Sequence, residues 1–113
     1  MKRGDIWIVA GGSGYAGKPR PAVILQADAF DATASITICP LTSHIVQAPL
    51  MRLSIAPSER NGLRSASDVM IDKITTVART KLERRIGRLS DADLVRVKRA
   101  AVVFLGLAGP RPR

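Results

Sequence analysis

The sequence has very few of the side chains that bind metals or form disulfides. Its 113 residues include one cysteine, Cys39, and one histidine, His44. A disulfide framework is therefore excluded, and two such residues cannot supply the three or four soft ligands of an ordinary zinc site. We expect any catalysis to proceed without a metal or another cofactor, and we expect Cys39, inside an apolar strand, to be buried and inert.

Long apolar runs are also missing. The longest, residues 100–108, is about half of the ~20 residues that cross a bilayer as a helix. Lys2 and Arg3 resemble the start of a signal peptide, but Asp5 follows at once, and residues 6–10 are too short for its apolar segment. We expect a cytoplasmic protein that neither spans nor binds a membrane.

Acidic residues are scarce relative to basic ones. There are 9 Asp and Glu against 18 Lys and Arg, a net charge of +9, while 46% of the residues are hydrophobic. The composition indicates a folded domain with an anionic partner rather than a disordered basic tail. Residues 79–113 carry 10 of the cations and 3 of the anions, which favours general attraction to phosphates. For Arg96, Lys98 and Arg99, a merely solvated surface is the alternative.

Short β-type segments followed by one helical segment dominate the pattern. At this length we expect one domain over residues 1–109 and a disordered basic tail over residues 110–113. Alternation and β-branched runs predict strands at residues 6–10, 22–26, 35–39, 50–55, 67–71, 75–77 and 85–89. The predicted class is mainly β, a small antiparallel barrel or curled sheet with a C-terminal helix. Doubly wound folds are excluded because strands and helices do not alternate.

The helix has start and stop signals of its own. Ser90 and Asp93 resemble a capping box, and acidic side chains favour a helix N-terminus. Gly109 and Pro110 should end the helix. The apolar stripe that should dock on the sheet or on another subunit consists of Leu94, Val97, Ala101, Phe104, Leu105 and Ala108.

A glycine-rich stretch follows the first strand. Residues 12–17 match G-x-G-x-x-G, but a strand rather than a helix comes next, so no helix N-terminus is available for a pyrophosphate. We therefore reject a dinucleotide site. The stretch fits a loop that rearranges over a ligand, in which Tyr15 can stack on a base. A plain hairpin loop is the alternative.

Arg20 is the strongest candidate for an anion-binding side chain. Pro19 and Pro21 flank it and restrict the backbone. A guanidinium on such a stiff base can clamp phosphate oxygens or stabilise a charged transition state. The alternative is an arginine that only marks the edge of a strand.

Further polar candidates lie at strand ends. Thr42 and Ser43 follow the third strand and can hold a phosphate oxygen or a ribose hydroxyl, while His44 can move a proton or be a plain loop histidine. Asp72 and Lys73 interrupt a later strand. They place a hydrogen-bond acceptor beside a donor, which is what a protein needs to recognise the edge of a nucleotide base. They can instead form a weak surface ion pair.

Six fragments together resemble the MazF/PemK family of toxin endoribonucleases. They occur in the family's order and spacing over nearly the whole chain, and they are residues 2–7 (Lys-Arg-Gly-Asp-Ile-Trp), 20–25 (Arg-Pro-Ala-Val-Ile-Leu), 40–43 (Pro-Leu-Thr-Ser), 61–63 (Asn-Gly-Leu), 72–77 (Asp-Lys-Ile-Thr-Thr-Val) and 86–90 (Ile-Gly-Arg-Leu-Ser). The resemblance implies a CcdB/PemK-like fold, that is, an SH3-like curled antiparallel β-barrel with a C-terminal α-helix. It also implies a homodimer, blocked by a cognate acidic antitoxin, that cuts single-stranded RNA, often mRNA, at short sequence motifs.

Position by position, the resemblance assigns catalytic roles to Arg20 and Thr42. It places Ser43, Asp72 and Lys73 where family members contact RNA, and we add Tyr15, Lys18 and His44 to this predicted RNA-binding set. Some members use a first-loop histidine and an arginine two positions before the aspartate. This chain has no histidine in that loop, and Met70 occupies the arginine position.

The implied reaction needs neither a metal nor a protein nucleophile. The ribose 2′-OH attacks the phosphorus and leaves a 2′,3′-cyclic phosphate and a 5′-OH. Two alternatives stay open: a gyrase-poisoning toxin of the same fold, and a non-catalytic RNA- or DNA-binding barrel. The gyrase-poisoning pattern ends in Trp-Gly-Ile, whereas this chain ends in Gly-Pro-Arg-Pro-Arg at residues 109–113.

Overall fold

The computed structural model of the chain describes residues 1–11 and 18–107, and in them one sheet and one α-helix. The predicted tail at residues 110–113 lies outside this range, as does Tyr15. The seven strands are β1 (Asp5–Val9), β2 (Arg20–Ile24), β3 (Ser35–Thr42), β4 (Arg52–Ile55), β5 (Ser67–Met70), β6 (Thr75–Ala78) and β7 (Leu82–Arg88). Short 3-10 turns are η2 (Asp28–Phe30), η3 (Ile71–Lys73) and η4 (Arg79–Lys81), and the helix is α1 (Asp91–Phe104).

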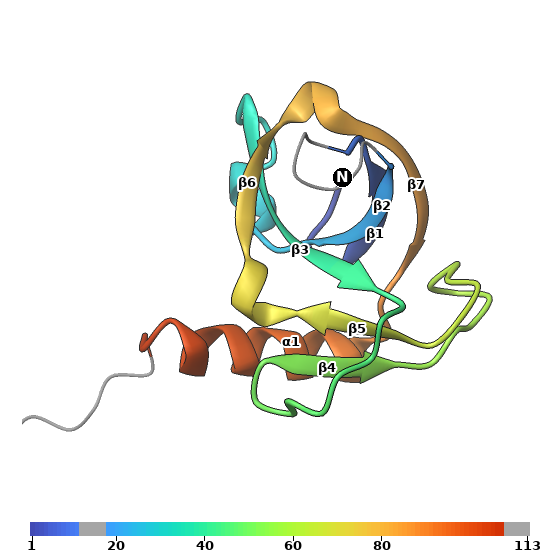
Figure 1. Ribbon diagram of the computed structural model, residues 1–113. Helices are drawn as coiled ribbons and strands as arrows, with labels where there is room; N and C mark the ends of the chain where they lie inside the picture. Colours follow the sequence, from blue (N-terminus) through green and yellow to red (C-terminus); the bar gives the residue numbers. More distant parts are fainter. Residues whose placement is uncertain (12–17, 108–113) are drawn as a thin grey trace, which may run out of the picture.

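The sheet is antiparallel at every pairing and strongly curled (Figure 1). Its strand order is β4-β5-β3-β2-β1-β7, and β6 also pairs with β3. The first half of β3 pairs with β6, while Leu41 and Thr42 at its end pair with β5. The predicted curled antiparallel sheet with a C-terminal helix is confirmed, with the qualification that the sheet curls without closing into a barrel.

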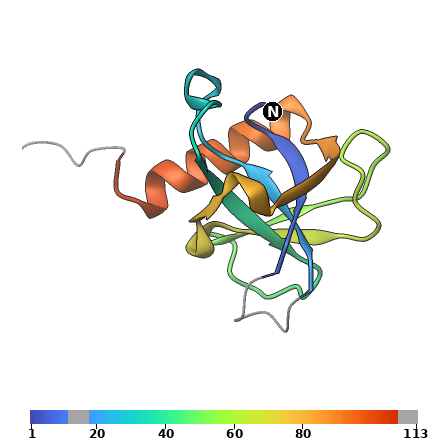
Figure 2. The same ribbon diagram turned by 90° about the horizontal axis from the view of Figure 1, so that it is seen from above.

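The helix begins where the sequence predicts. The Ser90 hydroxyl accepts a hydrogen bond from the Asp93 amide at 3.1 Å, and Asp91 and Asp93 occupy the first turn. The helix runs along one side of the sheet, next to β4 and β5 (Figures 1 and 2). Among the described residues, no helix is long and apolar enough to span a membrane.

The predicted end of the helix is wrong. Helix α1 ends at Phe104, before Gly109, because Gly106 adopts φ +71° two residues later. The amides of Gly106 and Leu107 donate to the carbonyls of Val103 and Val102, which is the Schellman arrangement that closes a helix. Phe104 and Leu105, expected on the buried stripe, are 44% and 49% exposed.

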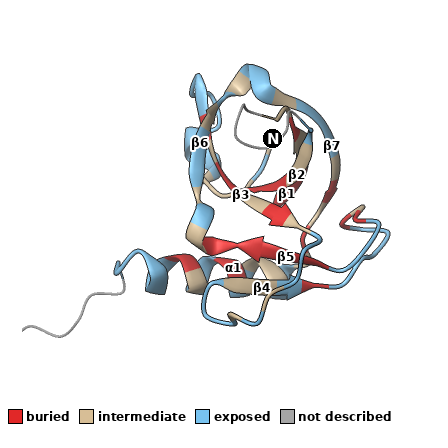
Figure 3. Ribbon diagram, viewed as in Figure 1, coloured by how far each residue is buried: buried red, intermediate tan, exposed pale blue. Residues whose placement is uncertain are grey.

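The core consists of two clusters of buried side chains, and Figure 3 shows where buried residues lie along the strands and the helix. The larger lies between sheet and helix and contains Ile6, Val23, Cys39, Leu41, Ile55, Leu63, Val69, Ile71, Leu89 and Val97. The smaller contains Val9, Ala22, Ile24, Ile36 and Ile38, with the partly buried Trp7 packed against it.

Three strand boundaries differ from the predicted ones in ways that matter for function. Strand β2 begins at Arg20 instead of Ala22, β3 continues from Cys39 to Thr42, and β7 begins at Leu82. Pairing with neighbouring strands causes the extensions, since Arg20 lies opposite Val9 and Thr42 lies opposite Asp68. Arg20 and Thr42 are therefore strand residues whose backbones are fixed by the sheet.

Candidate active site

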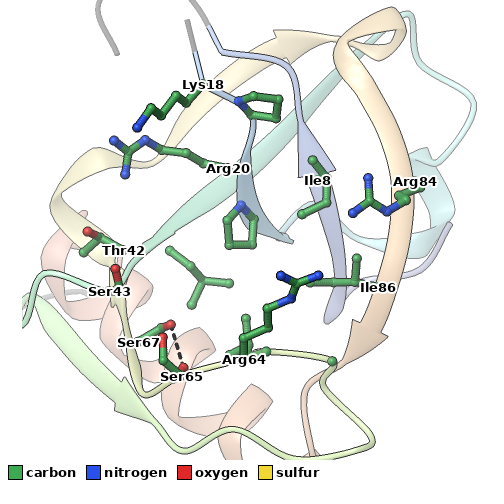
Figure 4. A pocket seen from close by; sticks show the side chains of 15 residues that line it. Ile8, Lys18, Arg20, Thr42, Ser43, Arg64, Ser65, Ser67, Arg84 and Ile86 are labelled. Atoms are coloured by element: carbon green, nitrogen blue, oxygen red, sulfur yellow. Dashed lines mark hydrogen bonds between the residues drawn. The ribbon is translucent and has the colours of Figure 1, made fainter. Parts of the chain in front are cut away.

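A pocket of about 620 Å³ opens where β2 and β3 meet the β4–β5 loop and β7 (Figure 4). Its lining combines the apolar residues Ile8, Leu41, Leu63 and Ile86 with polar and basic side chains. The lining residues are Ile8, Lys18, Pro19, Arg20, Pro21, Leu41, Thr42, Ser43, Gly62, Leu63, Arg64, Ser65, Ser67, Arg84 and Ile86.

Arg20 enters this pocket from the first residue of β2. Its backbone pairs with Val9 of β1, and the rings of Pro19 and Pro21 restrict the chain on both sides. Figure 4 shows its guanidinium beside Lys18, on the side of the pocket where Thr42 and Ser43 lie. The four predicted site residues that the pocket brings together are thus Lys18, Arg20, Thr42 and Ser43.

Thr42 is held by the end of β3. Its neighbour across the ladder, Asp68, is buried and accepts a hydrogen bond from the Val46 amide at 3.3 Å. The Thr42 hydroxyl oxygen accepts a hydrogen bond from the His44 amide at 3.1 Å. A hydroxyl has one proton to donate besides the lone pairs that accept, so the Thr42 proton remains available for an oxygen of a ligand.

The opposite wall carries two arginines that the sequence did not single out, Arg64 and Arg84. Arg64 follows a tightly bonded loop around Asn61. The Asn61 side-chain oxygen accepts from the amides of Ser58 and Leu63 at 3.0 and 2.9 Å, and its NH₂ donates to the Ala56 carbonyl at 2.9 Å. The Asn61-Gly62 pair does predict a turn just before Arg64, but the sequence does not show that this turn lies against β7.

The pocket is strongly positive. Lys18, Arg20, Arg64 and Arg84 line it, and no aspartate or glutamate is among its lining residues. Four cations around one hollow favour a polyanionic ligand. Arginine presents five donors in a planar fork and stays charged, which suits it to phosphate oxygens.

The structure does not bring every described residue of the predicted RNA-binding set to this pocket. His44 and Lys73 are exposed, and neither they nor Asp72 line it. The Asp72 carboxylate is bound by Arg52 of β4, with Nε to Oδ1 at 2.8 Å and Nη2 to Oδ2 at 3.2 Å. These hydrogen bonds lower the pKa of Asp72 below its ordinary value of 3.8. The Asp72 carboxylate, which we expected to accept a hydrogen bond from a base edge, is therefore already bound by Arg52.

Cys39 is fully buried, as expected. Burial, with a smaller effect of the Asp72 charge, raises the pKa of its thiol to about 12. The thiol is therefore protonated at neutral pH and is no nucleophile. In the part of the chain that the structure describes, no group of three or more His, Cys, Asp or Glu side chains has an arrangement that could hold a metal ion.

The described residues thus form a small curled antiparallel sheet with a C-terminal helix and a cationic pocket suited to a polyanion, and comparison with known proteins gives the family. Residues 2–105 match the family described as PemK-like, MazF-like toxin of type II toxin-antitoxin system. The chain is 52% identical to a probable endoribonuclease MazF of Mycolicibacterium smegmatis, with 96% of this chain and 100% of the relative covered.

Two further comparisons agree. Endoribonuclease MazF9 of Mycobacterium tuberculosis is 33% identical, with 95% of this chain and 98% of the relative covered. A solved endoribonuclease in complex with its cognate antitoxin, from a mycobacterial species, has a TM-score of 0.78 at 25% identity and covers 99% of both chains. The chain belongs to the PemK-like, MazF-like toxin family, and it is a toxin endoribonuclease of the MazF type.

Proposed function

We propose that this endoribonuclease cuts single-stranded RNA by attack of the ribose 2′-OH on the adjacent phosphorus. The 2′-oxygen forms a bond to phosphorus as the bond to the 5′-oxygen breaks. The proton of the 2′-OH is removed, and the departing 5′-oxygen gains a proton. The products are a 2′,3′-cyclic phosphate and a 5′-OH. Since the substrate supplies its own nucleophile, the protein must only position the RNA and stabilise charge.

The observation that carries this proposal is the placement of Arg20 and Thr42 in one acid-free cationic pocket. Arg20 stabilises the extra negative charge of the pentavalent phosphorane with the positive charge and the N–H donors of its guanidinium. Thr42 donates its hydroxyl proton to a non-bridging oxygen, while its oxygen accepts the hydrogen bond from the His44 amide. Neither role requires a metal.

The neighbouring polar residues belong to substrate binding in this proposal. Lys18 and Ser43 line the same pocket and contact the RNA beside the cut, with mRNA cut at short motifs as the expected target. Tyr15, His44, Asp72 and Lys73 are further RNA contacts in this proposal, and of these the described residues His44, Asp72 and Lys73 do not line the pocket. A cognate acidic antitoxin blocks the enzyme by covering the same cations; one solved relative was determined with its antitoxin. We place the working enzyme in the cytoplasm as a homodimer.

The test is cleavage of a mixed-sequence single-stranded RNA in EDTA by three proteins: the natural chain, Arg20→Ala and Arg99→Ala. Arg99 lies exposed on α1 and does not line the pocket, so it controls for the loss of one positive charge. We expect Arg20→Ala to lose at least about a thousand-fold in rate, with an unchanged circular dichroism spectrum, and Arg99→Ala to stay within about two-fold.

Retained cutting by Arg20→Ala would remove Arg20 from the mechanism. Inhibition of gyrase supercoiling without any RNA cleavage would favour the gyrase-poisoning alternative. RNA that is bound with a steep salt dependence and left intact would favour a passive binding barrel.

A further inference from the structure

Most arginines of the described chain are already bound to protein groups. Acidic side chains bind Arg52, Arg60, Arg85, Arg88 and Arg96, and backbone carbonyls bind Arg3 and Arg79. Within residues 1–11 and 18–107, the side chains of Arg64, Arg84 and Arg99 form no hydrogen bond or ion pair. Two of these three, Arg64 and Arg84, line the pocket.

Strand alternation aims Arg84 into the pocket. In β7, Arg84 lies opposite Ile8 and Arg85 lies opposite Trp7. Because neighbouring strand residues face opposite sides, Arg85 reaches the buried Asp5, at 3.4 Å, while Arg84 joins Ile8 and Ile86 in the pocket lining. Of these two adjacent arginines, Arg85 therefore forms an ion pair with Asp5, and Arg84 lines the pocket.

Arg64 is fixed to the same wall by its loop. Gly62 lies so close to β7 that a Cβ atom there would be 2.0 Å from the Ile86 carbonyl oxygen, and the Arg88 amide donates to the Arg60 carbonyl at 2.9 Å. Leu63 is buried and anchors the next position. Figure 4 shows Arg64 reaching toward Ile86, on the opposite side of the pocket from Arg20 and Thr42.

Arg64 and Arg84 are exposed cations that line the same pocket, and neither has an acidic partner among the described residues, so both are available to an anion. We propose that Arg64 and Arg84 together bind a backbone phosphate of the RNA next to the one that is cut. The strand then crosses the pocket from the Arg20 side to β7, over the apolar surface of Ile8 and Ile86. This proposal rests on the proposed function, and it makes Arg64 and Arg84 substrate-binding residues that do not touch the reacting atoms.

Binding to an RNA that cannot be cut tests this proposal separately from cleavage. The probe is a fluorescent, mixed-sequence 12-mer of 2′-O-methyl ribonucleotides, whose attacking hydroxyl is blocked. Its affinity is measured by anisotropy across a salt series for the natural chain, Arg64→Ala, Arg84→Ala and the double variant. Arg60→Ala is the control from the same loop, since Arg60 pairs with Asp91 and does not line the pocket.

We expect Arg64→Ala and Arg84→Ala each to weaken binding about ten-fold, with the slope of log K against log salt reduced by about 0.7, the value for one phosphate on a single strand. Since Arg64 and Arg84 hold the same phosphate, the slope of log K against log salt should fall by about 0.7 in the double variant as well, and not by the sum of the two single losses. In cleavage, KM should rise while kcat stays within about two-fold. Arg60→Ala should match the natural chain.

Equal binding by Arg64→Ala, Arg84→Ala and Arg60→Ala would overturn the proposal even if the natural chain cuts RNA. A fall of about 1.4 in the slope of the double variant would contradict the claim that the two arginines bind one phosphate together. If the natural chain cuts no RNA but the expected slope losses appear, the phosphate site stands and the proposed function fails.

Discussion

Gly62 is the residue on which the shape of the pocket depends most directly. It combines φ +72° with the close approach to the Ile86 carbonyl, and on the other side a Cβ at Gly87 would lie 2.3 Å from the Asn61 carbonyl. Only a residue without a side chain fits this contact between loop and strand. This contact holds the loop that leads to Arg64 against β7, the strand that carries Arg84.

Gly62→Ala should lower the free energy of unfolding in urea by more than about 3 kcal/mol, because left-handed strain is added to a steric clash with backbone. Gly106→Ala is the matched control. Gly106 has a similar φ of +71°, but nothing lies within 4 Å of the place that an alanine methyl group would occupy there. It should lose about 1 kcal/mol, the strain alone. Equal losses in the two variants would contradict the close contact at Gly62.

At single residues, the sequence singled out four of the residues that line the pocket, Lys18, Arg20, Thr42 and Ser43, and their roles stay predictions. Arg20 could be found because its two flanking prolines are local, and Thr42 and Ser43 because they follow an apolar strand. Arg64 and Arg84 could not, since the sequence is rich in arginine and only the fold separates paired from unpaired ones. The RNA-binding role of Asp72 stays a prediction, now for a carboxylate that Arg52 already binds.

At the scale of elements, the ion pair between Arg52 and Asp72 joins β4 to η3. Because the folded-state pKa of Asp72 lies below 3.8, folding is stabilised by this carboxylate above that pH. The contribution is lost as pH falls from about 3.8 through the folded-state pKa, where both states become protonated.

Asp72→Asn should therefore cost about 1 kcal/mol of unfolding free energy at pH 7, and the difference from the natural chain should shrink below about pH 4. Urea unfolding at a series of pH values measures this. Asp31→Asn is the control, because Asp31 is exposed and its carboxylate has no hydrogen bond within the described residues. A cost for Asp72→Asn that grows on acidification would contradict the sign.

Local signals predicted the elements better than their ends. Ser90 and Asp93 are three residues apart, so the start of α1 could be found from the sequence. The starts of β2 and β7 depend on pairing with β1, as in the match of Leu82 with Val9, which short windows do not contain. The helix end was misplaced because Gly106 stops it before the more conspicuous Gly109-Pro110.

At the scale of the whole molecule, the basic charge is less available than its sum suggests. Of the cations in residues 79–113, Arg85, Arg88 and Arg96 are bound to acidic side chains and Arg79 to carbonyls. Among the described cations of that segment, only Arg84 lines the pocket. The other cations of the pocket, Lys18, Arg20 and Arg64, come from earlier parts of the chain. The fold therefore brings cations that are far apart in the sequence together in one pocket.

A large apolar area is left uncovered at the end of the helix, comprising Val102, Val103, Phe104, Leu105 and Leu107. Single small domains seldom leave such patches in water. We expect a homodimer, and light scattering at micromolar concentration should give about 24 kDa, twice the chain mass of 12.1 kDa. A mass near that of one chain would contradict the dimer.

The central claim, that the RNA's own 2′-OH is the nucleophile in a pocket built on Arg20 and Thr42, is tested most directly by the chemistry of the cut ends. Single-stranded RNA cut by the natural chain in EDTA should carry a 2′,3′-cyclic phosphate on one fragment and a 5′-OH on the other. Fragments with 3′-OH and 5′-phosphate ends, or cutting that needs added metal, would contradict the account.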